Sequence, residues 1–273
     1  QERGVEFLSW TAGLELGAIL ADDMGLGKTV QALGWLAHLR ATDPDGGPSL
    51  VVCPASVVHN WEREAARFVP DWRVLVLARG EERHALRADI AQYDLVVTNY
   101  ALLRHDIDAW REIPLRVAIL DEAQNIKNPD AAVTRAALAL RARHRLVLTG
   151  TPLENRALDL WSLMNFVSPG YLGSRQQFAA RYDRADTPPH RRAMLAARLR
   201  PVLLRRLKKD VAQELPERIE ERRDCELSVG QRKLYLAELR RSQQLVAQID
   251  SRPAEFNRQR IQILAALTRL RQI

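Results

Sequence analysis

The chain has 273 residues, 47% of them hydrophobic, which is enough to bury a core in one large or two modest domains. No apolar run approaches the roughly 20 residues that a membrane span needs, so we expect no membrane segment. The two cysteines, Cys53 and Cys225, lie far apart without metal-site spacing, which fits a reduced compartment.

The formal net charge of +7 is concentrated in residues 181–209. This segment has ten basic and two acidic residues, a net of +8, whereas the rest of the chain has 31 basic and 32 acidic residues. A local positive field of this kind suits a polyanion such as nucleic acid. A solvated, charged helix face explains the part at residues 191–200 equally well.

The first motif follows residues 18–21, an apolar stretch that we expect to be a strand. It is a glycine-containing loop that leads into a helical pattern, with the sequence Asp22-Asp23-Met24-Gly25-Leu26-Gly27-Lys28-Thr29. The two glycines allow a tight turn and a close approach to a phosphate, at which the amides of the next helix would point. Lys28 can reach the outer phosphates, and the Thr29 hydroxyl can bind Mg²⁺. The strict P-loop pattern has glycine in place of Asp22, and a solvated glycine-rich turn is the alternative interpretation.

Short apolar runs alternate with helical patterns through the first half of the chain. Such alternation predicts an α/β fold, with a mainly parallel sheet covered by helices on both faces. Ligands bind beyond the carboxyl ends of the strands in such sheets. The expected strands are residues 18–21, 50–53, 74–77, 95–98, 117–120 and 146–148, and the expected helices include residues 29–40, 58–68 and 131–140.

A second motif lies at the end of the strand expected at residues 117–120. Asp121 and Glu122 follow directly, and a buried parallel strand that delivers carboxylates at its C-terminal edge suits a nucleotide-bound Mg²⁺. Asp121 would hold the metal, usually through water, and Glu122 would orient and polarise the attacking water. An acidic helix N-terminus explains one carboxylate, but not the pair together with the lysine loop.

The pattern changes in the second half of the chain. Residues 154–200 are mostly helical, and residues 202–204 can return a strand to the sheet because Pro201 discourages a continuous helix. Residues 218–227 are expected to be extended, and residues 229–273 to form two long amphipathic helices with a break near residues 252–253. We therefore divide the chain into a nucleotide-binding lobe (1–153), a mostly helical segment (154–211) and a helical extension (212–273).

The order of the motifs resembles the SWI/SNF-type branch of the superfamily-two helicases, which are ATP-driven translocases on double-stranded DNA. In that family aspartate is usual at position 22, and Gln124 resembles a variant of bacterial members. The matching segments cover nearly the whole chain: Gln1 with Gly4, Val5 and Trp10 (glutamine motif), Leu20–Thr29 (motif I), Val51–Ser56 with Asn60 and Trp61 (motif Ia), Val97–Leu103 (motif Ib), Asp121–Asn128 (motif II), Leu148–Asn155 (motif III), and Arg200–Val211 with Glu214–Pro216 (segment before a helical insertion).

The resemblance implies a RecA-like P-loop NTPase lobe that uses ATP and Mg²⁺. Its implied catalytic residues are Lys28, Asp121 and Glu122, with Thr29 and Asp121 at the metal. The implied nucleotide-binding residues are Gln1, Asp23, Met24, Gly25, Leu26, Gly27, Lys28 and Thr29. The residues implied to couple nucleotide state to the grip on DNA are Gln124, Thr149, Gly150 and Thr151.

The resemblance also implies contacts to the phosphates of one DNA strand. Such contacts position a motor without reading sequence, which suits a translocase. An ordinary strand-end turn explains residues 98–100 equally well. The implied contact residues are Pro54, Ala55, Ser56, Thr98, Asn99, Tyr100 and Lys127.

The family's motor has two such lobes with ATP between them, and the second lobe supplies arginine fingers. This chain ends before such a lobe begins, and we identify no arginine-finger motif among its 36 arginines. We therefore expect a piece of a longer cytoplasmic, nucleoid-associated bacterial protein, nearly inactive in hydrolysis alone. The expected partners are double-stranded DNA and, as the target, RNA polymerase or another DNA-bound protein.

Two other classes of protein remain open. One is another superfamily-two P-loop enzyme, such as a restriction-type helicase subunit, and the segment after Pro201 argues against it. The other is a non-catalytic module that binds DNA or RNA polymerase. Such a module would have kept the fold but lost turnover, and the presence of Lys28, Asp121 and Glu122 argues against this loss.

Overall fold

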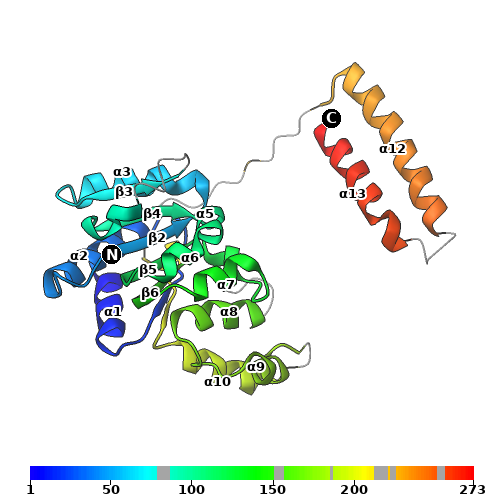
Figure 1. The fold of residues 1–273 in the computed structure, drawn as a ribbon. Coiled ribbons are helices and arrows are strands. Elements are labelled where there is room, and N and C mark those ends of the chain that lie inside the picture. The colour runs from blue at the N-terminus through cyan, green and yellow to red at the C-terminus, as the bar shows by residue number, and fades with distance from the viewer. Residues whose placement is uncertain (79–86, 151–156, 185–186, 212–220, 222–225, 251–255) are drawn as a thin grey trace. The chain divides into compact units, whose positions relative to one another are not determined.

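The structure is a computed structural model that describes residues 1–78, 87–150, 157–184, 187–211, 221, 226–250 and 256–273 (Figure 1). Its internal contacts divide the chain into two units, Gln1–Leu215 and Pro216–Ile273, and each is described by itself. None of the helices in the described ranges is both long enough and apolar enough to cross a membrane.

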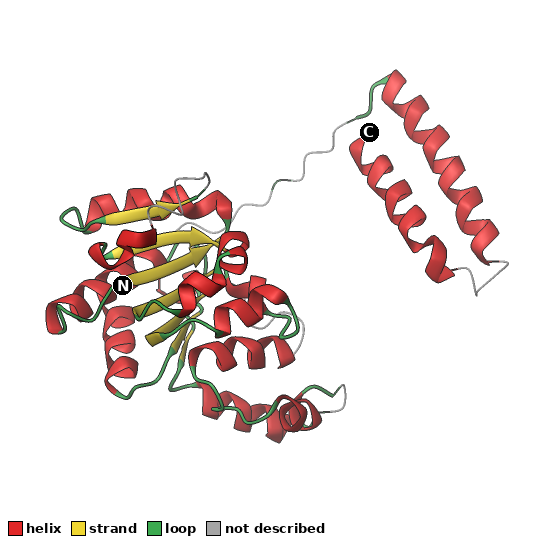
Figure 2. Ribbon diagram, in the orientation of Figure 1, coloured by secondary structure: helices red, strands yellow, loops and turns green. Residues whose placement is uncertain are grey.

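The first unit is built around a sheet with the strand order β3-β4-β2-β5-β6-β1-β7 in the described part of the chain (Figure 2). All neighbouring strands are parallel, so their carboxyl ends meet at one edge. The strands are β1 (Ala18–Leu20), β2 (Ser49–Cys53), β3 (Val74–Leu77), β4 (Leu95–Asn99), β5 (Leu115–Asp121), β6 (Ala142–Leu148) and β7 (Leu203–Leu204).

Helices follow most strands and continue after the last long one. Those of the first unit are α1 (Glu2–Gly13), α2 (Lys28–Thr42), α3 (Val58–Phe68), α5 (Tyr100–His105), α6 (Ile107–Arg111), α7 (Ala132–Leu138), α8 (Ala157–Val167), α9 (Arg175–Tyr182), α10 (Pro189–Leu199) and α11 (Lys208–Val211). Short 3₁₀ helices are η1 (Ala55–Val57), η2 (Arg87–Gln92) and η3 (Ala123–Ile126).

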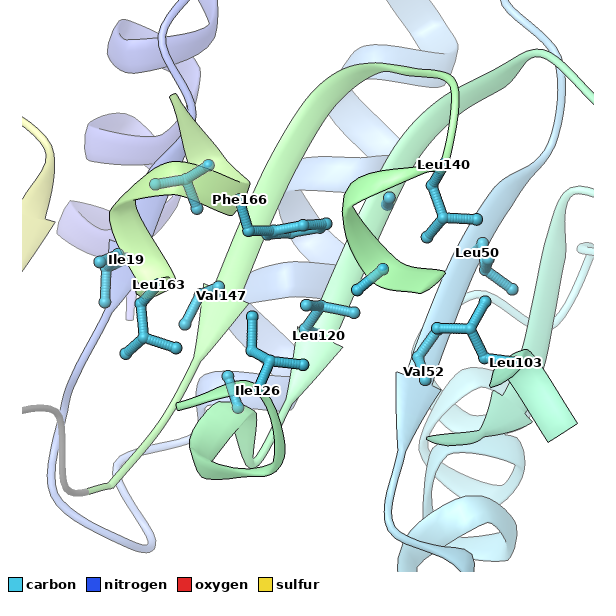
Figure 3. Packing of buried hydrophobic residues seen from close by; sticks show 14 of the residues in the cluster. Ile19, Leu50, Val52, Leu103, Leu120, Ile126, Leu140, Val147, Leu163 and Phe166 are labelled. Carbon is cyan, nitrogen blue, oxygen red and sulfur yellow. The ribbon is translucent and has the colours of Figure 1, made fainter. Parts of the chain in front are cut away.

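The sheet is buried on both faces. Successive strand residues point to opposite sides, and helices cover the apolar residues on each side. On one face Leu20 and Ile119 pack with α1, α2 and α3. On the other face Ile19 and Leu120 pack with α5, α6, α7 and α8, and Figure 3 shows them on the same side of the sheet as Phe166 of α8. The expected α/β fold with helices on both faces is confirmed.

Two strands begin earlier than their apolar runs predict. β5 starts at Leu115 and β6 at Ala142, and these two residues pair with each other. The extension of β5 includes Arg116, which is buried because its guanidinium donates to the carbonyls of Asp43 (2.8 Å) and Pro44 (2.9 Å). A polar side chain with a hydrogen-bonded terminal group can therefore occupy a strand that hydrophobicity alone would shorten. The buried Nε of Arg116 has no hydrogen-bond partner among the described residues.

The return of a strand to the sheet is confirmed at Leu203–Leu204. This strand, β7, pairs in parallel with β1, so that Leu203 lies opposite Ile19 and Leu204 opposite Leu20. The preceding residues form the expected helices α8, α9 and α10. The chain thus comes back to the strand that precedes the loop at residues 22–29.

The second unit contains two helices in the residues described, α12 (Val229–Asp250) and α13 (Phe256–Gln272). They form the expected helical pair, with an ion pair between Arg269 and Glu238 at 3.4 Å. Tyr235 and Leu239 of α12 are partly buried. The expected break at residues 252–253 and most of the expected extended segment at 218–227 lie outside the described residues.

Candidate nucleotide site

The loop at residues 22–29 connects β1 to α2 at the carboxyl edge of the sheet. Its glycines have positive φ angles, 83° at Gly25 and 77° at Gly27, a conformation that side chains rarely adopt. Gly27 is the N-cap of α2, so its geometry sets the start of that helix. A Cβ atom on Gly25 would also lie 2.9 Å from the ammonium nitrogen of Lys208. The path of the loop therefore depends on glycine at both positions.

Lys28 is the first residue of α2, and its side chain reaches back into the loop. Its Nζ donates hydrogen bonds to the carbonyl oxygens of Asp22 (2.7 Å) and Asp23 (3.3 Å). The positive charge is thus held beside a helix N-terminus, whose amides and dipole attract anions. A phosphate bound there would meet the ammonium group and the amides together.

Helices from both faces of the sheet fix Asp121 at the end of β5. Trp61 of α3 donates from Nε1 to Oδ2 of the carboxylate at 2.8 Å, and the Glu122 amide donates to Oδ1 at 2.9 Å. Tyr100 of α5 donates its hydroxyl to the Asp121 carbonyl at 2.7 Å. Trp61 and Tyr100 are both buried. Sequence reasoning missed the role of Trp61, because the two residues lie 60 positions apart.

Burial raises the pKa of the Asp121 carboxyl above its ordinary value. The hydrogen bond from Trp61 and the positive charge of Lys28 lower the same pKa and favour the ionised form. The lysine of one motif and the carboxylate of the other follow strands that lie on either side of β6, so both lie at the carboxyl edge of the sheet. A carboxylate kept partly desolvated in this way is typical of functional sites.

Glu122 adopts an unusual backbone conformation directly after the strand. Its φ and ψ angles of 49° and 54° are left-handed, which costs on the order of 1–2 kcal/mol for a residue with a side chain. Gln124 donates to its carboxylate at 2.9 Å, and Asn125 donates to its carbonyl at 2.9 Å. Gln124, which we expected to couple nucleotide state to DNA, therefore contacts the second acidic residue directly.

Thr29 and Asp121 have the donor chemistry for a Mg²⁺ ion that a nucleotide also holds. Mg²⁺ prefers oxygen ligands and usually binds one or two carboxylates together with substrate phosphates and water. Within the ranges that the structure describes, no group of three or more His, Cys, Asp and Glu side chains could hold a metal. A hydroxyl and a carboxylate fit a Mg²⁺ ion whose other ligands are nucleotide phosphates and water.

The end of β6 lies between the two motifs, because β6 pairs with β1 on one side and β5 on the other. Thr149 is buried, and its amide donates to the Leu20 carbonyl at 3.1 Å. A Cβ atom on Gly150 would lie 3.4 Å from the side chain of Met24. These two expected coupling residues thus lie against β1 and its loop. Thr151 lies outside the described residues.

An open groove of about 540 Å³ with a largely apolar lining lies between α1 and α2, and Glu2 and Glu6 are among the residues that line it. Gln1 is close to the loop, since its Nε2 would be 2.5 Å from a Cβ atom on Gly27. An apolar pocket with a few polar groups at its edge suits a flat heterocyclic base. Its lining includes Gln1, Val5, Val30, Gln31, Gly34 and His38.

Asp22, the residue that departs from the strict P-loop pattern, is a fully buried counter-ion. Arg206 donates to its carboxylate from the backbone amide and Nε, both at 3.0 Å, and from a terminal guanidinium nitrogen. Gln31 of α2 donates to Asp22 at 3.3 Å and accepts from Arg206 at 2.6 Å. The only signal in the sequence was the substitution itself, since a buried carboxylate needs a cationic partner.

The pairing of Arg206 removes one charge from the basic segment at residues 181–209. Its cationic group faces a buried carboxylate and is not offered to a polyanion. The other basic residues of the segment are exposed: Arg181, Arg184, Arg191, Arg192, Arg198, Arg200, Arg205, Lys208 and Lys209.

Some of the expected DNA-contacting residues lie at the surface of the same edge of the sheet. Ala55 and Ser56 are exposed on η1, directly after β2, and Pro54 beside them is partly exposed. Lys127 follows η3, beyond the end of β5, and is partly exposed. These four positions are accessible to a phosphate backbone.

The expected contacts at residues 98–100 need correction. Thr98 and Tyr100 are buried, and their hydroxyls donate to the carbonyls of Leu77 (3.1 Å) and Asp121 (2.7 Å). Asn99 caps the N-terminus of α5 with its side chain. These side chains form a strand-to-helix turn, the alternative given above, and the burial of Thr98 and Tyr100 leaves them no surface for a phosphate.

Known proteins are similar to this chain in sequence. The SNF2-related domain family matches residues 1–273. YwqA of Bacillus subtilis is 40% identical over 243 residues, which cover 86% of this chain and 26% of that protein. The TATA-binding protein-associated factor MOT1 of Saccharomyces cerevisiae is 33% identical over 299 residues, which cover 100% of this chain and 16% of that protein.

Solved structures share its fold. The Sulfolobus solfataricus SWI2/SNF2 ATPase core in complex with double-stranded DNA matches with a TM-score of 0.70 and 36% identity, over 99% of this chain and 56% of that one. The SWI2/SNF2 ATPase core domain of the same organism matches with a TM-score of 0.67 and 34% identity. This chain thus spans about half of the solved cores and about a quarter or less of YwqA and MOT1. The expected RecA-like lobe is confirmed, and the chain belongs to the SNF2-related family.

Proposed function

We propose that the chain is the ATP-binding lobe of a SNF2-type translocase that acts on double-stranded DNA. In the complete protein this lobe would bind ATP with Mg²⁺ and take part in its hydrolysis. One observation carries the proposal. The Lys28 ammonium, held inside the P-loop, shares the carboxyl edge of a parallel sheet with the acidic pair Asp121 and Glu122.

Each of these groups has a part in phosphoryl transfer, which depends mainly on positioning and on charge stabilisation. Lys28 and the first amides of α2 would hold the outer phosphates, and Asp121 and Thr29 would hold the metal. Bound Mg²⁺ would neutralise charge on the phosphates. Glu122, oriented by Gln124, would accept a hydrogen bond from the attacking water and polarise it.

Double-stranded DNA is the proposed polymer on which the protein moves. The solved SWI2/SNF2 core with double-stranded DNA supports this partner. The nine exposed basic residues between positions 181 and 209 supply positive charge for phosphates. Ala55, Ser56 and Lys127 are accessible at the edge of the sheet that carries the nucleotide site. Phosphate contacts of this kind read no sequence, which suits a translocase.

The proposed object of the motor is a protein bound to DNA. The relative MOT1 is a TATA-binding protein-associated factor, and its similarity supports this class of target. RNA polymerase, the more specific expectation, has no support from these relatives. We also propose a bacterial, nucleoid-associated protein of the cytoplasm, on the basis of the resemblance of Gln124 to the variant of bacterial members.

A non-catalytic module that binds DNA is the competing function. The geometry disfavours it, because such a module would have no need for a lysine held in a phosphate-binding loop. It would also have no need for a left-handed Glu122 held by Gln124. Residues that carry no function rarely keep a strained backbone.

The test is steady-state ATP hydrolysis by the complete protein with duplex DNA, single-stranded DNA and RNA. We expect duplex DNA to stimulate hydrolysis most. Lys28→Ala and Glu122→Gln should each lower the stimulated rate by roughly 100-fold or more, as loss of about 2.7 kcal/mol of transition-state stabilisation implies. Lys233→Ala, which changes an exposed lysine of the second unit, should have no effect. Full turnover by Lys28→Ala, or equal stimulation by RNA, would contradict the proposal.

The 273-residue chain alone should hydrolyse ATP slowly or not at all. An arginine finger supplied across an interface is worth roughly 10³–10⁵ in rate, and the resemblance places such residues in a second lobe. Turnover by the isolated chain that duplex DNA stimulates and Lys28→Ala abolishes would disprove this part.

A further inference from the structure

Arg206 is connected to three points of the P-loop. Its backbone amide and guanidinium donate to the Asp22 carboxylate. Its carbonyl accepts from the Asp23 amide at 3.0 Å. Gln31, which accepts from Arg206, also donates to the Leu26 carbonyl at 3.0 Å. Arg206 thus contacts Asp22 and Asp23 at the start of the loop directly, and it is linked to Leu26 through Gln31.

The residues on either side of Arg206 also contact β1 and the P-loop. Leu203 and Leu204 pair with β1, the strand that leads into the loop. The Lys208 amide donates to the Asp23 carboxylate at 2.9 Å, and the Lys208 ammonium nitrogen lies beside Gly25. We call residues 203–208 the return segment. It lies along β1 and the P-loop from the strand to the loop's first glycine.

The buried ion pair is an addition to what phosphate binding requires. The strict P-loop pattern has glycine at the position of Asp22, which would leave Arg206 without this partner. The Asp22 carboxylate is 0% exposed and the Arg206 side chain 19% exposed, so each needs the other. The carbonyl of the same Asp22 also accepts from Lys28 at 2.7 Å. The position of Asp22 therefore links Arg206 to the lysine that would meet the phosphates.

We propose that Arg206 is a positioning residue of the nucleotide site. Through Asp22 and Gln31 it holds the P-loop in its phosphate-binding conformation and fixes the position of the Lys28 side chain. The return segment is thereby part of the nucleotide site, although Arg206 is 184 residues from Asp22 in the sequence. Displacement of this segment would loosen the loop and weaken nucleotide binding. This inference rests on the proposed function.

The test separates positioning from simple stabilisation. The paired variant Asp22→Asn with Arg206→Met removes both charges, so that neither is left buried alone. Arg206→Lys keeps the charge but loses the forked contacts of the guanidinium. Arg141→Met is the matched control, because it changes an exposed arginine directly before β6, at the end of the strand away from the P-loop. For each variant we would measure thermal unfolding, hydrogen exchange of the amides at residues 23–27 without nucleotide, and the Kd of a fluorescent ADP with Mg²⁺.

We expect the paired variant to fold, with loop amides that exchange about tenfold faster or more and a Kd raised about tenfold or more. Arg141→Met should match the unaltered chain in every measurement. A folded paired variant with unaltered loop exchange, or with an unaltered Kd, would overturn the proposal. If the paired variant does not fold, Arg206→Lys decides. Faster loop exchange with a higher Kd supports positioning, and unchanged values reject it.

Failure of this inference is distinguishable from failure of the proposed function. Hydrogen exchange requires no nucleotide, so it tests the hold of Arg206 on the loop even if the chain binds no ADP. If the unaltered chain does not bind ADP, the proposed function is contradicted, but the role of Arg206 in positioning the P-loop is not. Normal ADP binding by the folded paired variant would remove the role of Arg206 and leave the function intact.

Discussion

At the scale of residues, the charged groups of the site are held by side chains from other elements. Trp61 of α3 holds the carboxylate of Asp121, and Gln124 holds that of Glu122. Arg206 holds that of Asp22. Such partners fix orientation before a substrate arrives, which is the general requirement for positioning catalysis.

The Trp61 hydrogen bond predicts a metal-specific defect. Trp61→Phe keeps most of the buried volume but removes the donor at 2.8 Å from Asp121. A hydrogen bond to a charged group is worth about 1.5–3 kcal/mol, so we expect ADP binding with Mg²⁺ to weaken roughly tenfold or more. The Kd of a fluorescent ADP with Mg²⁺ and with EDTA measures this effect.

The control for that measurement is Trp10→Phe, because Trp10 is 53% exposed. It should leave the Kd unchanged under both conditions. An equal loss of affinity for Trp61→Phe with Mg²⁺ and with EDTA would show that the indole does not act through the metal ligand.

The thiol of Cys53 predicts a loss of stability at alkaline pH. Burial, with a smaller contribution from the charge of Asp121, raises its pKa to about 12. The unfolded thiol ionises near a pKa of about 8.5, so only the unfolded state gains from deprotonation as the pH rises above that value. Between pH 8 and pH 10 the free energy of unfolding should fall by about 2 kcal/mol more in the unaltered chain than in Cys53→Ala. Urea unfolding at the two pH values measures it, and identical slopes for the two proteins would exclude the effect.

At the scale of elements, the site exists because parallel strands bring distant motifs to one edge. β1 carries the P-loop, β5 carries the acidic pair, and β6 lies between them. β7 adds the return segment beside β1. The helices α8–α10 lie between β6 and β7 in the sequence, so the position of the return segment depends on how they pack.

Helix α8 should accordingly be part of the cooperative core of the lobe. Leu163 in α8 is fully buried against the sheet (Figure 3). Leu163→Ala should lower the free energy of unfolding by about 2–5 kcal/mol, because it leaves a cavity. Met194→Ala in α10, where the side chain is 59% exposed, should change it by less than about 0.5 kcal/mol. Urea unfolding of the two variants tests this, and equal effects would place α8 outside the core.

Most elements could be predicted from hydrophobic alternation, because each strand buried on both faces forms an apolar run. The ends of β5 and β6 could not, since Arg116 and His144 belong to paired strands although they are polar. In the site, the lysine loop and the acidic pair were recognisable because their chemistry is local in the sequence. Trp61 and Arg206 were not, because their roles depend on contacts across 60 and 184 residues.

At the scale of the whole molecule, the chain is one lobe of a larger family architecture. It spans 56% of a solved SWI2/SNF2 core and 26% of YwqA. Its nucleotide site faces the carboxyl edge of the sheet, where the accessible residues Ala55, Ser56 and Lys127 also lie. Under the proposed function, such a lobe would bind nucleotide and contact DNA at one edge, and turnover would require groups from elsewhere in the protein.

The most direct test of the account is equilibrium binding of a fluorescent ADP with Mg²⁺ to the 273-residue chain. The account predicts measurable binding, a Kd about 10–100-fold higher for Lys28→Ala, and no change for Lys233→Ala. The estimate follows from the loss of charge-assisted hydrogen bonds from Lys28 to phosphate. Equal affinity of the unaltered chain and Lys28→Ala would contradict the claim that the loop at residues 22–29 holds the nucleotide.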